Sequence, residues 1–359
     1  KEYLGQEVVP NSGCGSWLFE PQSTNLITQS EDFSQWSTIN STILSNNAIS
    51  PSGIQDANRI TATSTGDASF ARNTSVTQAI STTYSFSCFV KKGTTNFVRL
   101  ANRAIGGAVD TSAWFDIENG VVGVLGSLLS SSNIKDFGNG WYRCTAIGNT
   151  SGTIANQLLD IAASTSDGVT GAVIGDFMYT YGAMLEQQSY ATSYISTSGT
   201  TKTRNQDLCT NGGDVSLISS TEGTLYAEIA ALADDSALVS MALSDGSSSN
   251  RVNILLNSTD NQIRGIVRSN NIAIMDNFYT VTSTLNYHRV AVKYKENDFA
   301  VWIDGVERFN ASSGNTPIGL NKLSFNLGSS SLPFFGKTKA IAVWKEALSD
   351  TELTELTTI

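Results

Sequence analysis

The chain consists of two successive runs of short strands, and this pattern restricts its fold more than any other feature. Apolar and polar residues alternate over residues 84–90 in the first run and over residues 223–229 in the second. A period of two places alternate side chains on opposite faces of a sheet. Turn signals such as Asn119-Gly120 separate the strands and leave no room for helices between them. We therefore predict an all-β protein that contains two tandem antiparallel β-sandwiches.

One helix signal stands close to the C-terminal end of the sequence. Ser349 and Glu352 match a capping box, in which each side chain bonds to the backbone N–H of the other residue. The residues that follow, up to Leu356, suit a helix. We predict one short C-terminal helix beside the two sandwiches.

Changes in composition divide the chain into four segments. Residues 1–22 form an N-terminal segment with consecutive Trp, Leu and Phe, and we expect it to pack on a domain or on a neighbouring subunit. Residues 23–200 are assigned to the first sandwich and residues 214–359 to the second. Residues 201–213 between them are polar and are predicted to be a linker.

Charge and hydropathy exclude two classes of partner. The formal net charge is −10, and such a surface repels the phosphate backbone of nucleic acids. No apolar run approaches the roughly 20 residues that a membrane span requires. We expect neither nucleic-acid binding nor membrane insertion.

Residues for catalysis are scarce. His288 is the only histidine, and it stands at the start of a predicted strand, where we interpret it as a structural residue rather than a catalytic base. No pair of acids is spaced along one strand as in glycosidases of this fold class. We predict a protein that is not an enzyme.

The four cysteines do not form a zinc-binding pattern. Cys88 and Cys144 lie within predicted strands and are interpreted as buried apolar residues. Cys14 and Cys209 flank the first sandwich, and a disulfide joins them if the two ends of that domain meet. Two free thiols are the alternative.

The first run of strands resembles a jelly-roll domain of tailed-bacteriophage virion proteins, which is similar to carbohydrate-binding modules. The resemblance is carried by residues 25–36, 84–93, 138–144 and 185–195. The second run resembles a concanavalin A-like lectin domain of the laminin G type. The phrases that carry it are residues 290–294, 301–305, 336–339 and 347–350.

The resemblance implies a bacteriophage virion protein in an extracellular particle, namely a fibre, spike or decoration subunit with lectin-like domains that attach to host-surface polysaccharide. It also implies other virion proteins as partners and a homo-oligomer, with a trimer favoured. Two alternatives stay open. One is a purely structural virion or adhesion module without glycan binding, and the other is the non-catalytic part of a carbohydrate-active enzyme.

Two sets of residues are candidates for binding. Tyr279, Phe334 and Phe335 lie in predicted loops and are candidate platforms for sugar rings, with burial in the core as the alternative. Jelly-roll modules of this kind often hold a structural calcium ion, and the resemblance assigns Glu31, Asp32 and Glu186 to it. Solvated or hydrogen-bonded carboxylates are the alternative. No other cofactor is expected.

Overall fold

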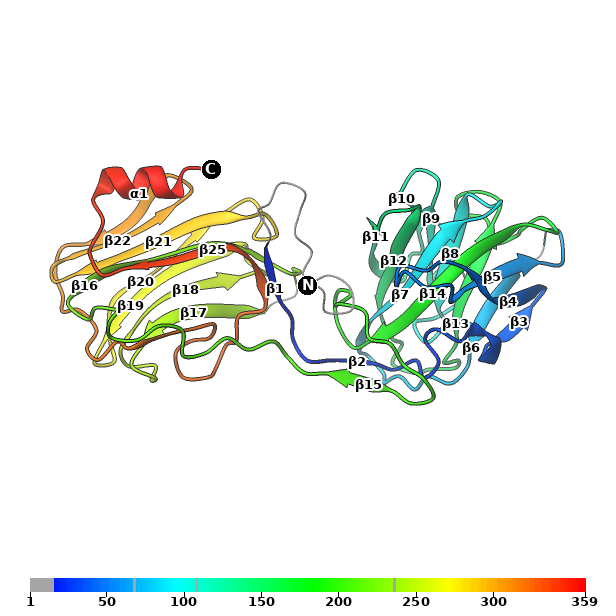
Figure 1. The fold of residues 1–359 in the computed structure, drawn as a ribbon, viewed down its shortest axis with the longest axis horizontal. Helices are drawn as coiled ribbons and strands as arrows, with labels where there is room; N and C mark the ends of the chain where they lie inside the picture. Colours follow the sequence, from blue (N-terminus) through cyan, green and yellow to red (C-terminus); the bar gives the residue numbers. More distant parts are fainter. Residues whose placement is uncertain (1–15, 67–68, 108, 235–236) are drawn as a thin grey trace. The chain divides into compact units, whose positions relative to one another are not determined.

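The computed structural model describes residues 16–66, 69–107, 109–234 and 237–359, which divide into two compact domains (Figure 1). One domain comprises residues 22–205. The other comprises residues 206–359 together with the described N-terminal residues 16–21. Each pair of hydrogen-bonded strands among the described residues is antiparallel, which confirms the predicted all-β class.

The first domain is a sandwich of two six-stranded sheets. One sheet has the order β10 (Val121–Leu125), β9 (Ser112–Asp116), β8 (Phe97–Asn102), β13 (Leu159–Ser164), β6 (Ser69–Asn73) and β3 (Ser37–Ile39). The other has the order β11 (Leu129–Asp136), β12 (Trp141–Asn149), β7 (Thr83–Lys92), β14 (Phe177–Glu186), β5 (Ala57–Ala62) and β4 (Ser41–Ala48). A short 3-10 helix, η1 (Phe33–Gln35), precedes β3.

Strand pairing in this domain is nested, and the nesting defines a jelly roll. β5 pairs with β14, β6 with β13, β7 with β12 and β8 with β9. Among these eight strands, the first therefore pairs with the last and each inner strand with its mirror partner, as in a doubled Greek key. The predicted jelly roll is confirmed by the topology of the chain itself.

The core of the jelly roll lies between its two sheets. Cys88 on β7 and Cys144 on β12 are directly opposite in the strand register, and both are fully buried free thiols. They belong to the same apolar cluster as Phe86 and Leu100. Burial raises the pKa of both thiols far above the ordinary range, which fits their interpretation as apolar core residues.

The second domain is also a sandwich of two sheets. Its six-stranded sheet has the order β1 (Trp17–Phe19), β25 (Gly336–Trp344), β16 (Glu222–Ala231), β21 (His288–Lys295), β22 (Asp298–Ile303) and β23 (Val306–Ala311). The five-stranded sheet has the order β20 (Ile272–Thr280), β19 (Gln262–Ser269), β18 (Arg251–Asn257), β17 (Leu238–Ser244) and β24 (Lys322–Ser324). Helix α1 (Asp350–Thr357) begins after Ser349, and the predicted capping box with Glu352 is present.

The N-terminal strand belongs to the C-terminal domain, so the jelly roll is an insertion within that domain. β1 pairs with β25, and Trp17, Leu18 and Phe19 lie opposite Thr338, Lys337 and Gly336. The chain then enters the jelly roll and returns after residue 205. Where the chain enters and leaves the jelly roll, β2 (Ser23–Asn25) pairs with β15 (Lys202–Arg204).

Residues 201–213, which were predicted to be a linker, instead belong partly to each of the two domains. The first part of this segment forms β15, and its second part is bound to the C-terminal domain. The Cys209 carbonyl accepts a hydrogen bond from the Phe325 N–H at 2.8 Å, and Gly212 exchanges backbone hydrogen bonds with Leu323. The polar composition of the segment reflects its position at an edge, and its backbone groups are satisfied by both domains.

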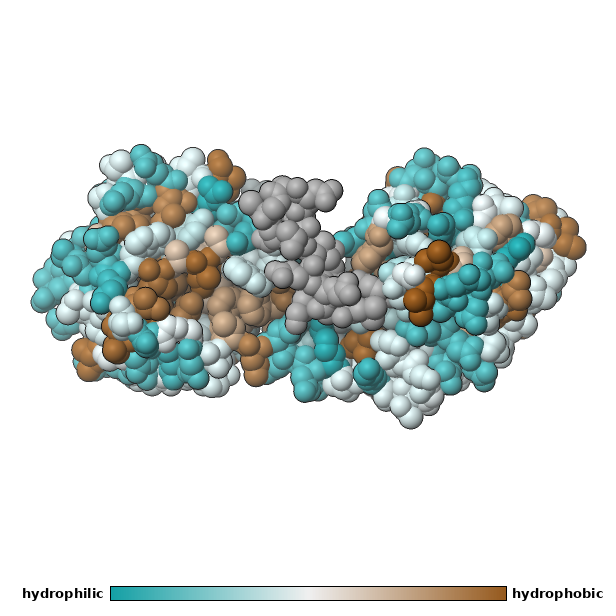
Figure 2. Space-filling view, viewed as in Figure 1, coloured by the Kyte–Doolittle hydropathy of each residue, from teal (hydrophilic) through white to brown (hydrophobic). Residues whose placement is uncertain are grey.

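Hydrophilic and intermediate residues, in teal and white, cover most of the visible surface of each domain, with brown hydrophobic patches between them (Figure 2). This distribution fits the low share of charged residues, 15%, because much of the polar surface is neutral. Among the described residues, no helix is both long and apolar enough to cross a membrane.

Candidate functional site

The aromatic residues predicted as platforms do not form one. Phe334 is only 1% exposed, and its ring packs edge-on against Phe325 at 5.7 Å between centroids, so it is a core residue and is unable to stack on a ligand. Phe335 and Tyr279 are partly buried against the same core. The Arg308 guanidinium covers the Tyr279 ring at 3.9 Å. Phe334 does lie in a loop before β25, but its ring is buried in the core. Tyr279, which was also assigned to a loop, lies in β20.

Glu186 serves as a buried hydrogen-bond acceptor in the jelly roll. Its carboxylate accepts from the Ser23 hydroxyl at 2.6 Å, from the Thr192 N–H at 2.8 Å and from the Thr192 hydroxyl at 2.6 Å. The carboxylate thereby joins β2, the end of β14 and the segment that follows it. Burial raises the pKa of Glu186, while Arg143 and these hydrogen bonds oppose the shift.

The other two residues of the predicted calcium site have partners of their own. Glu31 accepts hydrogen bonds from the hydroxyls of Tyr181 at 2.9 Å and Tyr194 at 3.2 Å. Asp32 is exposed and caps η1 by accepting from the Ser34 N–H. Among the described residues, no three acidic, histidine or cysteine side chains converge as a metal site. The structure therefore supports the alternative of hydrogen-bonded carboxylates and does not assemble the calcium site.

Only one half of the predicted disulfide is described. Cys209 is partly buried and has no disulfide partner among the described residues, and burial raises the pKa of its thiol. Cys14 lies outside the described residues. The pairing of Cys14 with Cys209 stays a prediction.

His288 has two hydrogen-bond acceptors around its ring, as expected for a structural residue. Its Nδ1 lies 2.6 Å from the Asp304 carboxylate, and its Nε2 lies 3.0 Å from the Ser283 carbonyl oxygen. Burial lowers the pKa of His288, but the bonds to Asp304 and Ser283 outweigh it, so the net pKa is raised. Two acceptors select the protonated ring, which donates from both nitrogens.

This environment gives a pH-dependent contribution to stability. Because the folded pKa of His288 is raised, the contribution is complete below about pH 6.5 and is lost as the pH rises through the folded pKa. We expect Asp304→Asn to lower the free energy of unfolding by about 1–2 kcal/mol at pH 6 and by less at pH 8. Chemical denaturation at both pH values measures this. Glu346→Gln, which removes an exposed charge, is the control, and an equal loss at the two pH values would contradict the assignment.

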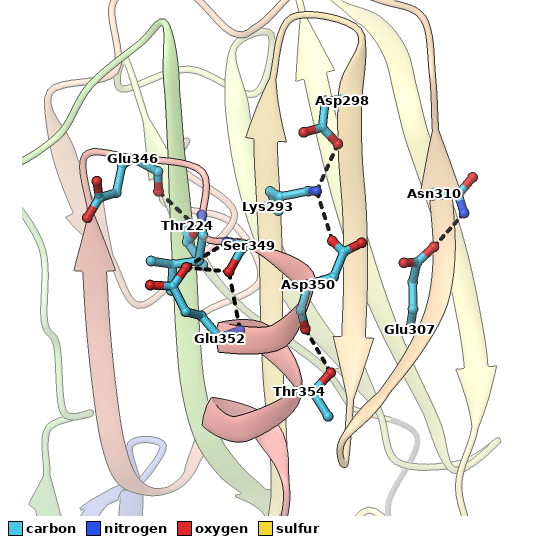
Figure 3. Close-up of polar contacts among 11 residues, drawn as sticks. Thr224, Lys293, Asp298, Glu307, Asn310, Glu346, Ser349, Asp350, Glu352 and Thr354 are labelled. Carbon is cyan, nitrogen blue, oxygen red and sulfur yellow. Dashed lines mark hydrogen bonds and ion pairs between the residues drawn. The ribbon is translucent and has the colours of Figure 1, made fainter.

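Acidic residues gather around helix α1, and the side chains of Asp298, Asp350 and Glu352 are used in structural contacts (Figure 3). The Lys293 ammonium lies between Asp298 at 2.8 Å and Asp350 at 3.4 Å. Burial lowers the pKa of Lys293, but these two carboxylates outweigh it and raise the net value. α1 packs on β21, β22 and β23, so it occupies the outward face of the six-stranded sheet. The outward face of the five-stranded sheet is therefore the candidate ligand-binding face of this domain.

The outward face of the five-stranded sheet follows from the alternation of its strands. On β18, Val252, Ile254 and Leu256 point into the core, so Arg251, Asn253 and Leu255 point outward. On β19, Arg264 and Arg268 point outward for the same reason. On β20, Met275 belongs to the core. Alternation along the strand therefore points Asp276 and Phe278 outward and Tyr279 inward.

The register brings these outward residues into adjacent rows. Leu255 lies opposite Arg264, and Arg264 lies opposite Phe278. Asn253, Ile266 and Asp276 form the next row in the same way, and Arg251 pairs with Arg268 in the row after it. We call the five residues Arg251, Arg264, Arg268, Asp276 and Phe278 the β18–β20 face.

Asp276 is the only carboxylate of the β18–β20 face, and it lies between two guanidinium groups. Arg264 Nη2 donates to Asp276 Oδ1 at 2.5 Å, and Arg268 Nη2 lies 3.6 Å from Asp276 Oδ2. Burial lowers the pKa of Arg251, and the positive charge of Arg268 lowers it further. Three guanidinium groups against one carboxylate give this face an excess of positive charge, although the chain as a whole carries −10.

The face has part-exposed guanidinium groups and an exposed aromatic ring. The Nε atoms of Arg264 and Arg268 are buried and have no hydrogen-bond partner among the described residues. The two side chains are 33% and 25% exposed, and Phe278 beside Arg264 is 52% exposed. An apolar ring next to planar, fixed donors suits a polar ligand with one flat apolar face, which is the character of a sugar ring.

Comparison with known proteins yields distant structural likenesses only. No family model and no curated protein matches the chain. The Ruminococcus gnavus IT-sialidase CBM40 bound to α2,3 sialyllactose is 13% identical, with 41% of this chain and 91% of that chain covered and a TM-score of 0.34. Domains LG4-5 of the mouse laminin α1 chain are 9% identical, with 79% and 92% covered and a TM-score of 0.28. At these scores the fold assignment rests on the strand pairing described above.

Sequence reasoning missed the β18–β20 face, although the signal is present. Residues 262–269 alternate Ile263, Gly265 and Val267 with two arginines, which marks one polar and one apolar side. Phe278 was missed because its neighbour Tyr279 was assigned to a loop, whereas β20 extends to Thr280.

Proposed function

We propose that this chain is a non-enzymatic virion protein of a tailed bacteriophage, a fibre, spike or decoration subunit, that attaches to host-surface glycan. The observation that carries glycan binding is the β18–β20 face, where exposed Phe278 adjoins the partly exposed arginine side chains of Arg264 and Arg268. The resemblance of the first strand run to a jelly-roll domain of tailed-bacteriophage virion proteins supports the assignment to a virion. Extracellular location, other virion proteins as partners and a homotrimer belong to the same proposal, and light scattering of the purified chain tests the trimer.

The glycan-binding part is tested with two variants of the face. We expect Phe278→Ala and Arg264→Gln each to weaken binding on a glycan array about tenfold, which corresponds to about 1.4 kcal/mol, because each removes a central contact. Unfolding temperatures should stay close to that of the unaltered chain, since both side chains are partly exposed.

Matched controls lie on the other sheet of the same domain. Val306→Ala removes an exposed apolar side chain from β23, and Lys295→Gln removes a charge whose side chain is 51% exposed. Neither should change binding. Equal binding by all four variants would exclude the β18–β20 face. An array silent for the unaltered chain would favour the alternative of a purely structural virion module.

A further inference from the structure

A second arginine cluster lies on the jelly roll, on the outward face of the sheet that contains β8. Val98 and Leu100 on this strand belong to the core, so Arg99 between them points to the opposite side. The register places Arg99 opposite Trp114 on β9 and opposite Ala162 on β13. Arg99 is nevertheless only 1% exposed, which is rare for an arginine without a paired acid.

The one carboxylate in this cluster is already occupied. Arg72 donates to Asp160 with Nε at 2.7 Å and with Nη2 at 3.0 Å, and Arg103 Nε donates to it at 2.7 Å. Asp160 is completely buried, and each of its two oxygens accepts at least one of these bonds. Two guanidinium groups therefore share one carboxylate, and the salt bridges of the described residues leave none for Arg99.

Arg99 presents a complete and empty donor edge. Its Nε and Nη2 atoms are buried and have no hydrogen-bond partner among the described residues. These two nitrogens form one edge of the guanidinium group, and Arg72 uses the same edge to hold both oxygens of Asp160. Burial and the neighbouring arginines lower the pKa of Arg99 to about 10, so the group is still charged at pH 7. An unpaired buried charge is destabilising until an anion compensates it.

We propose that the Nε–Nη2 edge of Arg99 binds the carboxylate of an acidic sugar. A carboxylate offers two coplanar oxygens that match this edge, and it supplies the negative charge that the cluster lacks. Arg72 and Arg103, whose side chains are 19% and 21% exposed, are the arginines of the cluster that solvent reaches. The choice of a sugar as the source of the carboxylate rests on the proposed function.

Thermal unfolding of the full chain tests this site, with D-glucuronate as the probe. Acetate and D-glucose, at the same pH and ionic strength, separate the contributions of the carboxylate and of the sugar. At ten times its dissociation constant, glucuronate should raise the unfolding temperature of the jelly roll by about 3 °C. Acetate should require higher concentrations for the same shift, and glucose should give none.

Arg99→Met separates a binding role from a structural one. This variant should lose the response to glucuronate. Without the anion, it should unfold at the same temperature as the unaltered chain or a higher one, because an unpaired buried charge has been replaced by an apolar side chain. Arg59→Met is the matched control. Arg59 lies on β5, in the opposite sheet, and its guanidinium group stacks on the Phe177 ring at 3.7 Å. Its removal should therefore leave the glucuronate response intact.

Each contrary result overturns a stated part of the proposal. A lower unfolding temperature for Arg99→Met, with no glucuronate shift in the unaltered chain, would make Arg99 a structural residue. A shift that survives Arg99→Met, or that Phe278→Ala abolishes, would place the anion elsewhere. Equal potency of acetate and glucuronate would overturn the assignment to a sugar. If the chain bound no glycan on the array, the proposed function would be refuted. The shift of the unfolding temperature by acetate would still be expected.

Discussion

Excision of the jelly roll is expected to leave a folded C-terminal domain. The variant lacks residues 22–205 and joins Pro21 to Gln206 through a short glycine-serine turn. The two ends are already side by side, because the Glu20 N–H donates to the Asp207 carboxylate at 3.0 Å and the Asp207 N–H donates to the Glu20 carbonyl at 2.9 Å. A short turn can therefore replace the inserted domain with little loop-closure entropy. Chemical denaturation should give one cooperative transition.

The simple C-terminal fragment, residues 206–359, is expected to be less stable than the excised chain by about 3 kcal/mol. It lacks β1, whose Phe19 ring stacks on Phe325 at 4.5 Å and meets Phe334 at 6.2 Å. Phe19→Ala in the excised chain should reproduce most of the loss. Trp17→Ala on the same strand is the control, because Trp17 is 54% exposed and should cost about 0.5 kcal/mol or less. Equal stability of fragment and excised chain would refute the insertion.

The insertion shows that alternating apolar and polar residues do not determine which strands pair. The period of two predicted sandwiches and many of their strands, because it reports which side chains share a face. It does not report which strand lies beside which. β1 and β25 are separated by more than 300 residues, and their pairing is fixed by the fit of Phe19 into a core built by distant strands. The polar residues 201–213 have the composition of a linker, although the chain uses them at the edges of two domains.

The binding face shows the same limit on a smaller scale. A shift of one position along a strand exchanges inside and outside. Tyr279 and Phe278 are adjacent, and only the continuation of β20 from Met275 decides that Phe278 points outward. The buried arginine of the jelly roll was equally hidden, because the segment around Arg99 has the pattern of an ordinary half-polar strand. That no acid in the described part of the chain pairs with Arg99 becomes visible only when Arg72 and Arg103 are found on Asp160.

Glu186→Ala is expected to be among the most destabilising single substitutions in the jelly roll. It removes the acceptor of three hydrogen bonds, and the Ser23 and Thr192 donors are left buried without it. Arg143, which donates to the Thr192 carbonyl at 2.6 Å, also loses its favourable charge interaction with Glu186. The free energy of unfolding should fall by about 3–4 kcal/mol. Chemical denaturation at pH 7 measures the loss.

The pH dependence of the Glu186 contribution separates this buried role from a metal-binding one. Because burial raises the folded pKa of Glu186, its contribution is largest below about pH 4.5 and decreases as the pH rises through the folded value. Glu186→Gln should abolish that slope and cost less than Glu186→Ala. Glu118→Ala is the control, since Glu118 is 43% exposed in its ion pair with Lys92 and should cost about 0–1 kcal/mol. A loss that appears only when calcium is present would restore the metal site, because hydrogen bonds from Ser23 and Thr192 need no ion.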